Sequence, residues 1–387
     1  MPSSGGVRPA DHSFGVFSPP GGAPRPGAVE GDAVLDLAGL ADAGLIDPAG
    51  GAFAAPVLNP FMAAGPAAWA AARDALGALR GDPRADAHRL PLGDVALHLP
   101  FAVADYADFY ASEHHASNLG RILRPGDEPL LPNWRRLPVG YHGRAGTVVL
   151  SGTDVVRPCG QYLGEDGEPA FGPSRRLDIE LELGFVVGVP SARGERVPVE
   201  RALEHVFGVV LLNDWSARDL QAWEYRPLGP FLGKSFATSI SPWVVTLDEL
   251  RRVAGPTQEP PPLDALRRTA RPPQEPAPLP YLAEAPWGLD VALAVELNGE
   301  RIAATSAREL YWSPAQMLAH LTANGASLRT GDLLGSGTIS GPGEGERGSL
   351  IELGWNGATR PFLADGDEVV LRGAGLGEVR GRILPAR

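Results

Sequence analysis

Three acidic residues alternate with apolar residues between positions 178 and 183. On an extended strand, Asp178, Glu180 and Glu182 would point to one face and the apolar residues to the other. Carboxylates that lie close together on one face repel one another unless water or a cation compensates their charge. The pattern is therefore typical of a solvated outer face or of a cation site, and the spacing leaves both open.

Two more acids occur where their solvation requires an explanation. Asp214 closely follows the apolar run 209–212, and an acid at the end of a buried strand usually needs a partner. Asp108 opens a segment rich in polar groups, residues 108–118. The chain has no zinc-type cysteine or histidine motif, since the two histidines at 114–115 are adjacent and would diverge. Carboxylates in this setting favour a hard cation, Mg²⁺ or Ca²⁺.

A single lysine, Lys234, stands among 33 arginines. Because arginine can replace a solvated surface lysine, the survival of Lys234 points either to chance or to a task that a planar guanidinium does not perform. Its context, residues 229–235, is similar to a phosphate-binding loop, but three residues separate the glycines instead of four. Phe231 and Leu232 would also crowd a bound phosphate.

The composition argues against several kinds of partner. The 387 residues carry a net charge of -12 with no basic tract, which argues against nucleic acid and anionic membrane surfaces. No apolar run reaches the ~18–20 residues that span a bilayer, and residues 1–30 lack the pattern of a signal peptide. The lone cysteine, Cys159, fits a reducing compartment. We therefore expect a soluble cytoplasmic protein.

The elements that must position these residues are mostly short strands. Apolar runs between glycines and prolines predict strands at 147–151, 178–187, 208–212, 242–246, 289–297 and 368–372. Helices are expected at 65–80, before a polar break at 81–86, and at 309–324. Without a regular alternation of strands and helices, the pattern predicts a mostly antiparallel β architecture. Residues 254–288 hold ten prolines and are expected to form a surface loop or insertion.

Several longer strings are similar to one known family. They include Asp108-Phe-Tyr110, His115-Ala-Ser-Asn118, Pro138-Val-Gly-Tyr141-His-Gly-Arg144, Glu180-Leu-Glu182, Asn213-Asp-Trp-Ser-Ala-Arg218-Asp-Leu-Gln221, Trp223-Glu-Tyr225, Leu232-Gly-Lys234-Ser-Phe236 and Gly335-Ser-Gly-Thr338-Ile-Ser-Gly341. Together they resemble the fumarylacetoacetate hydrolase family, nearly continuously over residues 105–245 and again over 305–372. The similarity is looser over residues 1–100.

The resemblance implies a mainly β fold in two parts. A small SH3-like N-terminal β-barrel would occupy residues 1–99, and a larger β-rich catalytic domain residues 100–387, with 254–288 as a proline-rich insertion. The resemblance also implies a homodimer and an enzyme whose substrate is a small diketo acid. The reaction would be hydrolysis of 4-fumarylacetoacetate to fumarate and acetoacetate, the last step of tyrosine degradation.

The same resemblance implies roles for individual residues. The ligands of Mg²⁺ or Ca²⁺ would be Asp108, Glu180, Glu182 and Asp214. The general base would be His115, positioned by Glu352. The reacting oxygens would be surrounded by Arg218, Gln221 and Lys234. Substrate would be bound by Tyr110, Arg124, Tyr141, Gln221, Tyr225 and Thr338, and a second cation would lie near Asp214, Lys234 and Thr238.

This set of residues suits the hydrolysis of a carbon–carbon bond. A 1,3-diketone chelates a divalent cation through two oxygens, and the cation polarises the carbonyl that is attacked. His115 would take the proton from water near neutral pH, and Glu352 on its other nitrogen would fix the tautomer. Arg218 and Lys234 would place positive charge where the oxyanion develops, and Arg124 suits a substrate carboxylate.

Other interpretations stay open from the sequence. An acylpyruvate hydrolase, or a 2-oxo acid decarboxylase or isomerase, would use the same catalytic domain, although decarboxylation needs no base that activates water. A phosphate-loop nucleotide-binding protein and a non-catalytic β scaffold are more remote alternatives. Taken singly, His115 fits a surface helix and Glu352 an outward strand position, and their spacing does not tell whether the two side chains meet.

Overall fold

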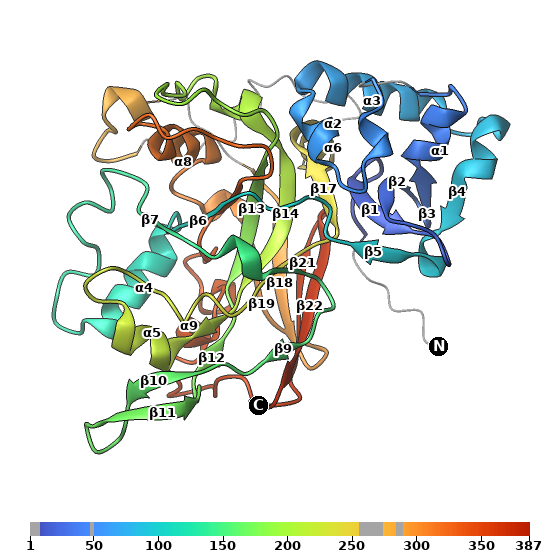
Figure 1. Cartoon of the computed structure of the whole chain (residues 1–387). Helices are drawn as coiled ribbons and strands as arrows, with labels where there is room; N and C mark the ends of the chain where they lie inside the picture. Colours follow the sequence, from blue (N-terminus) through green and yellow to red (C-terminus); the bar gives the residue numbers. More distant parts are fainter. Residues whose placement is uncertain (1–7, 47–49, 255–273, 284–288) are drawn as a thin grey trace.

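The strands of the described residues form two larger β-sheets and two small ladders. The computed structural model describes residues 8–46, 50–254, 274–283 and 289–387 (Figure 1). Within these residues the largest sheet has thirteen strands, and its main path runs through β4 (Arg89–Pro91), β3 (Ala33–Asp36), β2 (Arg25–Glu30), β1 (Phe14–Ser18), β17 (Trp243–Thr246), β14 (Val206–Asp214), β13 (Leu181–Val187), β20 (Leu333–Gly335), β6 (Tyr106–Phe109) and β7 (Gly140–His142). Off this path lie β5 (Ala96–His98), β16 (Thr238–Ile240) and β8 (Val148–Leu150).

A second sheet and two small ladders complete the β structure of the described residues. The second sheet has five strands in the order β19 (Glu300–Ser306), β18 (Ala292–Leu297), β21 (Glu368–Gly373), β22 (Gly377–Leu384) and β9 (Val155–Val156). The ladders join β10 (Cys159–Leu163) to β11 (Pro169–Pro173), and β12 (Leu177–Asp178) to β15 (Ser216–Ala217). Most pairs are antiparallel, while β16–β8, β20–β6 and β22–β9 are parallel. The expected mainly β fold is confirmed.

The described residues also form helices. They are α1 (Leu37–Asp42), α2 (Asn59–Ala63), α3 (Pro66–Ala78), α4 (Glu113–Leu123), α5 (Arg218–Glu224), α6 (Leu247–Ala254), α8 (Pro314–Leu321) and α9 (Leu350–Leu353). The helix expected at 309–324 is present but shorter, because Ser313 and Gln316 form a capping box and Pro314 starts the first turn. In the described part of the chain, no helix is both long enough and apolar enough to cross a bilayer.

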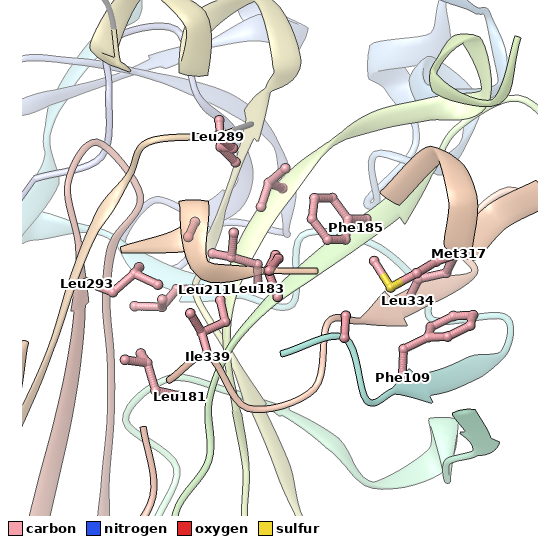
Figure 2. Close-up of a cluster of buried hydrophobic side chains, with 14 of the residues drawn as sticks. Phe109, Leu181, Leu183, Phe185, Leu211, Leu289, Leu293, Met317, Leu334 and Ile339 are labelled. Carbon is pink, nitrogen blue, oxygen red and sulfur yellow. The ribbon is translucent and has the colours of Figure 1, made fainter. Parts of the chain in front are cut away.

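The main hydrophobic core lies on one side of β13 (Figure 2). Leu181 and Leu183 of this strand pack there beside Leu211 of β14 and Leu293 of β18. The acids that alternate with these leucines face away from this core, yet they are buried as well. The alternation therefore fixes the register, because a slip of one residue would drive carboxylates into the core. The burial of these acids also excludes the solvated outer face that the sequence pattern had left open.

The N-terminal part packs firmly against the larger body (Figure 1). Phe14 of β1 pairs with Val244 of β17, so the first strand joins the main sheet directly. A second core gathers Phe14, Phe61 and Trp69 with Phe207 of β14. The helix expected at 65–80 is present as α3. The SH3-like closure of the N-terminal strands into a barrel stays a prediction.

Part of the proline-rich segment is included in the packed structure. Residues 255–273 and 284–288 lie outside the described residues, so the expected insertion is seen only at Ala254, the last residue of α6, and at 274–283. There Leu282 is fully buried. Gln274 donates from Nε2 to the backbone oxygen of Tyr311 over 2.8 Å and exchanges hydrogen bonds with Gln316 of α8. This stretch is therefore anchored on the body, contrary to a purely surface role.

Candidate active site

Four carboxylates converge at the ends of neighbouring segments of the main sheet. Asp108 lies on β6, and Glu182 lies on β13. Asp214 is the last residue of β14, and Glu180 directly precedes β13. Each side chain is buried and offers an oxygen, and these oxygens all lie within 4.8 Å of one another. The structure thus brings together the four acids that the sequence predicted as metal ligands.

A glycine on the strand between β13 and β6 leaves the space into which these carboxylates point. Gly335 of β20 is in register with Asp108. A Cβ at Gly335 would lie 2.6 Å from Asp108 Oδ1, 3.0 Å from Glu182 Oε2 and 3.2 Å from the Tyr106 hydroxyl. The string 335–341, one of the strings that resemble the family, therefore begins with a glycine that helps to shape this site.

Three of the oxygens around this space lack the partners that buried polar atoms need. Among the described side chains, Asp108 Oδ1, Glu182 Oε1 and the Tyr106 hydroxyl are buried without a hydrogen bond. Burial, and then the charge of neighbouring carboxylates, raises the pKa of both Asp108 and Glu182 well above the ordinary value. A divalent cation among these oxygen donors would relieve both effects, so the residues fit a hard metal ion.

Two cations balance part of this negative charge. Lys234 Nζ contacts Glu180 and donates to Asp214 Oδ2 over 2.6 Å. Arg218 Nη2 lies 2.7 Å from Glu180 Oε1, and its Nε donates to Asp178 over 2.8 Å. Burial alone would lower the pKa of Lys234 and of Arg218, but the neighbouring carboxylates outweigh burial and raise both. Both cations therefore stay protonated at the centre of the site.

The loop that leads to Lys234 does not form a phosphate cradle. The backbone N–H groups of Phe231 and Gly233 donate to Glu224 Oε1 over 2.9 and 2.7 Å. The N–H of Ser235 donates to the oxygen of Phe231 over 3.0 Å. These donors are therefore occupied, and a carboxylate lies where a phosphate would bind, which argues against the phosphate-loop alternative.

His115 and Glu352 meet, although they are far apart in the sequence. His115 Nδ1 lies 2.6 Å from Glu352 Oε2, and both side chains are buried. His115 sits in the first turn of α4, where Ser112 caps the helix by accepting the His115 N–H. Its Nε2 lies 3.9 Å from Glu180 Oε1 and so faces the carboxylate cluster. The structure excludes both the surface-helix position for His115 and the outward strand position for Glu352.

Three neutral side chains hold Glu352 in place. Asn118 donates to Oε1 over 2.9 Å, while Ser340 and Ser349 donate to Oε2 over 2.9 and 2.7 Å. Burial would raise the pKa of Glu352, but the charge of His115 and the hydrogen bonds from His115, Asn118 and Ser349 outweigh burial and lower it. Glu352 therefore stays an anion that accepts from His115 Nδ1.

Two tyrosines predicted to bind substrate line the site. Tyr141 of β7 donates its hydroxyl to Asp108 Oδ2 over 2.9 Å and to Asp214 Oδ2 over 3.1 Å. The Tyr110 ring stands edge-on to the His115 ring, with 5.3 Å between their centroids. Burial, and then nearby carboxylates, raises the pKa of both phenols, so both keep their protons. Tyr141 thus supports two of the proposed ligands, and Tyr110 packs against the proposed base.

The other residues that were predicted to bind substrate differ in their hydrogen-bond partners. Thr338 Oγ1 and Arg124 Nε are buried without a hydrogen bond among the described residues, which leaves both available to a ligand. Gln221 Oε1 accepts from Arg218 Nη1 over 3.2 Å. Tyr225 lies at the end of α5, where the guanidinium of Arg226 covers its ring. Of these residues, only Gln221 is tied by a hydrogen bond to the cluster, through Arg218.

Sequence reasoning missed polar residues that support the site. Tyr106 lies two positions before Asp108 on β6, so the period of two could have placed both on one face. Asn118 lies three positions after His115 on α4, a spacing that brings side chains together on a helix. Asp178 was grouped with the alternating acids, but its contact with Arg218 was not foreseen. Ser340 lies within the family string 335–341 but was given no role there, and Ser349 gave no signal.

Two family models match the chain. The first, described as Fumarylacetoacetase N-terminal, matches residues 13–100. The second, described as Fumarylacetoacetate (FAA) hydrolase C-terminal, matches residues 105–384. All of the site residues described above fall within the second match.

Named relatives are similar to the chain over almost its whole length. A fumarylacetoacetase of Caenorhabditis elegans is 45% identical over 413 aligned positions, which cover 96% of this chain and 95% of the relative. The Arabidopsis thaliana fumarylacetoacetase is 44% identical and covers 96% of this chain and 94% of its own. The Homo sapiens enzyme is 43% identical, with 96% and 95% covered.

Solved structures share the fold at lower identity. A fumarylacetoacetate hydrolase from Exiguobacterium antarcticum has a TM-score of 0.58 at 19% identity, covering 97% of this chain and 99% of the other. A maleylpyruvate hydrolase from Sphingobium has a TM-score of 0.54 at 18% identity, covering 97% and 100%. At these identities the likeness shows the fold alone.

Proposed function

This chain belongs to the fumarylacetoacetate hydrolase family, and on that premise we propose that it hydrolyses 4-fumarylacetoacetate to fumarate and acetoacetate, the last step of tyrosine degradation. The observation that carries the proposal is the 2.6 Å contact between His115 and Glu352 beside the carboxylate cluster. An oriented base next to a cation site supplies the two functions that hydrolysis of a diketone requires.

The four carboxylates are the proposed ligands of the cation, Mg²⁺ or Ca²⁺. Asp108, Glu180, Glu182 and Asp214 provide the oxygen donors that both ions prefer. When bound, such a cation supplies a Lewis acid to the oxygens of the diketone. A second cation is proposed near Asp214, Lys234 and Thr238, which are adjacent: the Thr238 hydroxyl donates to Asp214 Oδ1 over 3.2 Å, and Lys234 Nζ donates to Asp214 Oδ2 over 2.6 Å.

His115 is the proposed general base. It accepts a proton from water at Nε2, because Glu352 engages Nδ1 and stabilises the imidazolium that forms. The resulting hydroxide adds to the ketone carbon of the fumaryl part of the substrate. The bond from this carbon to the acetoacetate part then breaks, and its electron pair leaves with acetoacetate as an enolate. The proton held by His115 returns to the enolate carbon, so the base is regenerated.

Positive groups and donors of the chain stabilise the charge that develops. Arg218, Gln221 and Lys234 are the proposed partners of the reacting oxygens, since the two cations are buried beside the carboxylates. The remaining proposed contacts to substrate come from Tyr110, Arg124, Tyr141, Tyr225 and Thr338. Arg124 Nε and Thr338 Oγ1 have no hydrogen-bond partner among the residues that the structure describes, which supports roles for these two residues.

The proposed reaction is tested by its products. The purified protein is incubated with fumarylacetoacetate and divalent cation, and fumarate, acetoacetate and CO₂ are each quantified. We expect fumarate and acetoacetate in equal amounts and no CO₂. Formation of CO₂, or turnover of other acylpyruvates with fumarylacetoacetate left intact, would favour a related enzyme on the same domain.

Replacing Lys234 by arginine should lower kcat about 100-fold while the fold is kept. The ammonium is a compact charge buried between Glu180 and Asp214, and a planar guanidinium cannot occupy that position without displacing one of them. Steady-state kinetics and thermal unfolding measure the two effects. Arg84→Lys, at an exposed ion pair with Asp82, is the control and should leave kcat unchanged. Near-normal turnover of Lys234→Arg would contradict a specific role for the ammonium.

A homodimer is part of the proposal. Leu163 and Phe171 on the β10–β11 hairpin are 53% and 78% exposed, and Trp223 of α5 is exposed nearby, where it donates to Gln161. The hairpin extends from the lower edge of the body (Figure 1). Exposed apolar side chains that gather on one face are typical of a surface covered by a partner. Light scattering on the purified protein decides between one and two copies.

We also propose a division of the chain into two domains and a location of the protein in the cell. Residues 1–99 and 100–387 are the proposed domains, and the shared core of Phe14, Phe61 and Phe207 means that they would not move freely relative to each other. The free thiol of Cys159 supports a cytoplasmic location.

A further inference from the structure

Asp178 makes an unusual set of hydrogen bonds for a side chain outside the carboxylate cluster. It is fully buried, and each of its oxygens accepts two donors. Oδ1 accepts the backbone N–H groups of Ile179 and Leu350, both over 2.7 Å. Oδ2 accepts Arg218 Nε over 2.8 Å and the backbone N–H of Ile351 over 3.1 Å.

These donors come from two elements that carry the site. Arg218 is the first residue of α5, and its guanidinium continues from Asp178 to Glu180, 2.7 Å from its Oε1. Leu350 and Ile351 open α9, whose next residue is Glu352. Glu352 in turn accepts from His115. The carboxylate of Asp178 therefore connects Arg218, which is proposed to contact the reacting oxygens, with α9, the helix that carries Glu352.

We propose that Asp178 is a positioning residue, which fixes Arg218 and Glu352 relative to each other without touching substrate. The inference rests on the proposed function, because it presumes that Arg218 faces the reacting oxygens and that His115 is the base. A shift of about 1 Å in such groups can lower a rate about 100-fold.

Only a carboxylate satisfies all four donors. An asparagine in the same place would present an NH₂ group to one pair of them, whichever way its amide turned. Either Arg218 Nε and the Ile351 N–H, or the N–H groups of Ile179 and Leu350, would then face another donor. The charge-assisted bond to Arg218 would be lost in the first case and weakened in the second.

The first test compares Asp178→Asn with a matched substitution elsewhere. Asp36 is also buried, pairs with Arg25 over 3.0 Å and caps the start of α1 by accepting the Gly39 N–H over 3.0 Å. Both variants should lower the melting temperature. Asp178→Asn should lower kcat about 100-fold with KM changed less than about threefold, whereas Asp36→Asn should leave both constants unchanged. Equal kcat values for the two variants would overturn the proposal.

The second test is a pair of double-mutant cycles. If Asp178 acts through Arg218 and Glu352, Asp178→Asn should cost only about tenfold in kcat when it is added to Arg218→Ala or to Glu352→Gln, instead of about 100-fold. A purely structural residue would give factors that multiply in full, and that result would overturn the positioning role. Wild-type protein that released no acetoacetate would instead refute the proposed function, so the two failures are distinguishable.

A second variant covers the case in which Asp178→Asn does not fold. Asp178→Glu keeps the charge and all four acceptor sites but moves them outward by one methylene. We expect it to fold and to lose about tenfold in kcat, because Arg218 and α9 are displaced together. Full activity of folded Asp178→Glu would show that the site tolerates this displacement and would overturn the proposal.

Discussion

Replacing His115 by alanine should lower kcat for fumarylacetoacetate about 1000-fold, within the range that loss of a general base produces. The effect is large because His115 Nε2 faces the carboxylate cluster from a buried position, where its other nitrogen is held by Glu352. KM should change little, since the proposed substrate contacts come from other residues. Stopped assays of fumarate release over long incubations measure the residual rate.

The neighbouring histidine gives a matched control for this variant. His114 lies on the same helix, is half-buried, and has Nε2 3.6 Å from Glu309, away from the cluster. His114→Ala should therefore keep full activity. Glu352→Gln keeps the shape of the side chain but removes its charge, and it should fall between wild type and His115→Ala. Activity of His115→Ala above about a tenth of wild type would show that another group takes the proton.

Removal of divalent cation should abolish hydrolysis, and addition of Mg²⁺ or Ca²⁺ should restore it. The reason is the set of buried oxygens that have no donor among the described residues, Asp108 Oδ1 and Glu182 Oε1 among them. Bound cation should also raise the melting temperature, since it binds the folded state alone. Dialysis against a chelator, followed by titration of each ion, measures both effects. Undiminished turnover after chelation would contradict a metal-dependent reaction.

Gly335 offers a variant that weakens the cation site without removing a ligand. A Cβ at this position would lie 2.6 Å from Asp108 Oδ1 and 3.0 Å from Glu182 Oε2. These distances are too short for unstrained contacts, so the two carboxylates would have to shift. Gly335→Ala should therefore raise the cation concentration for half-maximal binding about tenfold, near the lower end of what disturbed ligand support produces. Gly146→Ala is the control, because its Cβ meets nothing within 4 Å. Unchanged cation affinity of Gly335→Ala would mean that the ion binds elsewhere.

The local sequence pattern and the resemblance to the family predicted the four proposed ligands. The part that the local pattern predicted depends only on residues that are neighbours in the sequence. Residues two apart on a strand share a face, so Glu180 and Glu182 point the same way once the leucines between and beside them enter the core. The helix α3 also follows from composition alone, and its bounds differ from the expected ones by only a few residues.

The rest of the site depends on long-range packing that no local pattern encodes. The helices α5 and α9 are short, and neither shows a periodic pattern, yet they place Arg218 and Glu352. The meeting of His115 with Glu352 requires the sheet to bring α4 and α9 together, so only the family motifs could suggest it. In the same way, the pairing of β1 with β17 joins segments that lie on opposite sides of the expected domain boundary.

The burial of Lys234 has a practical consequence for chemical labelling. It is the only lysine of the 387 residues, and in the folded protein its amine is ion-paired and held in the protonated form. Acylating reagents attack the neutral, accessible amine, so they should spare this side chain in native molecules and modify it in unfolded ones. The fraction of Lys234 that is acylated over time would then follow unfolding at a single, defined atom, without any engineered probe.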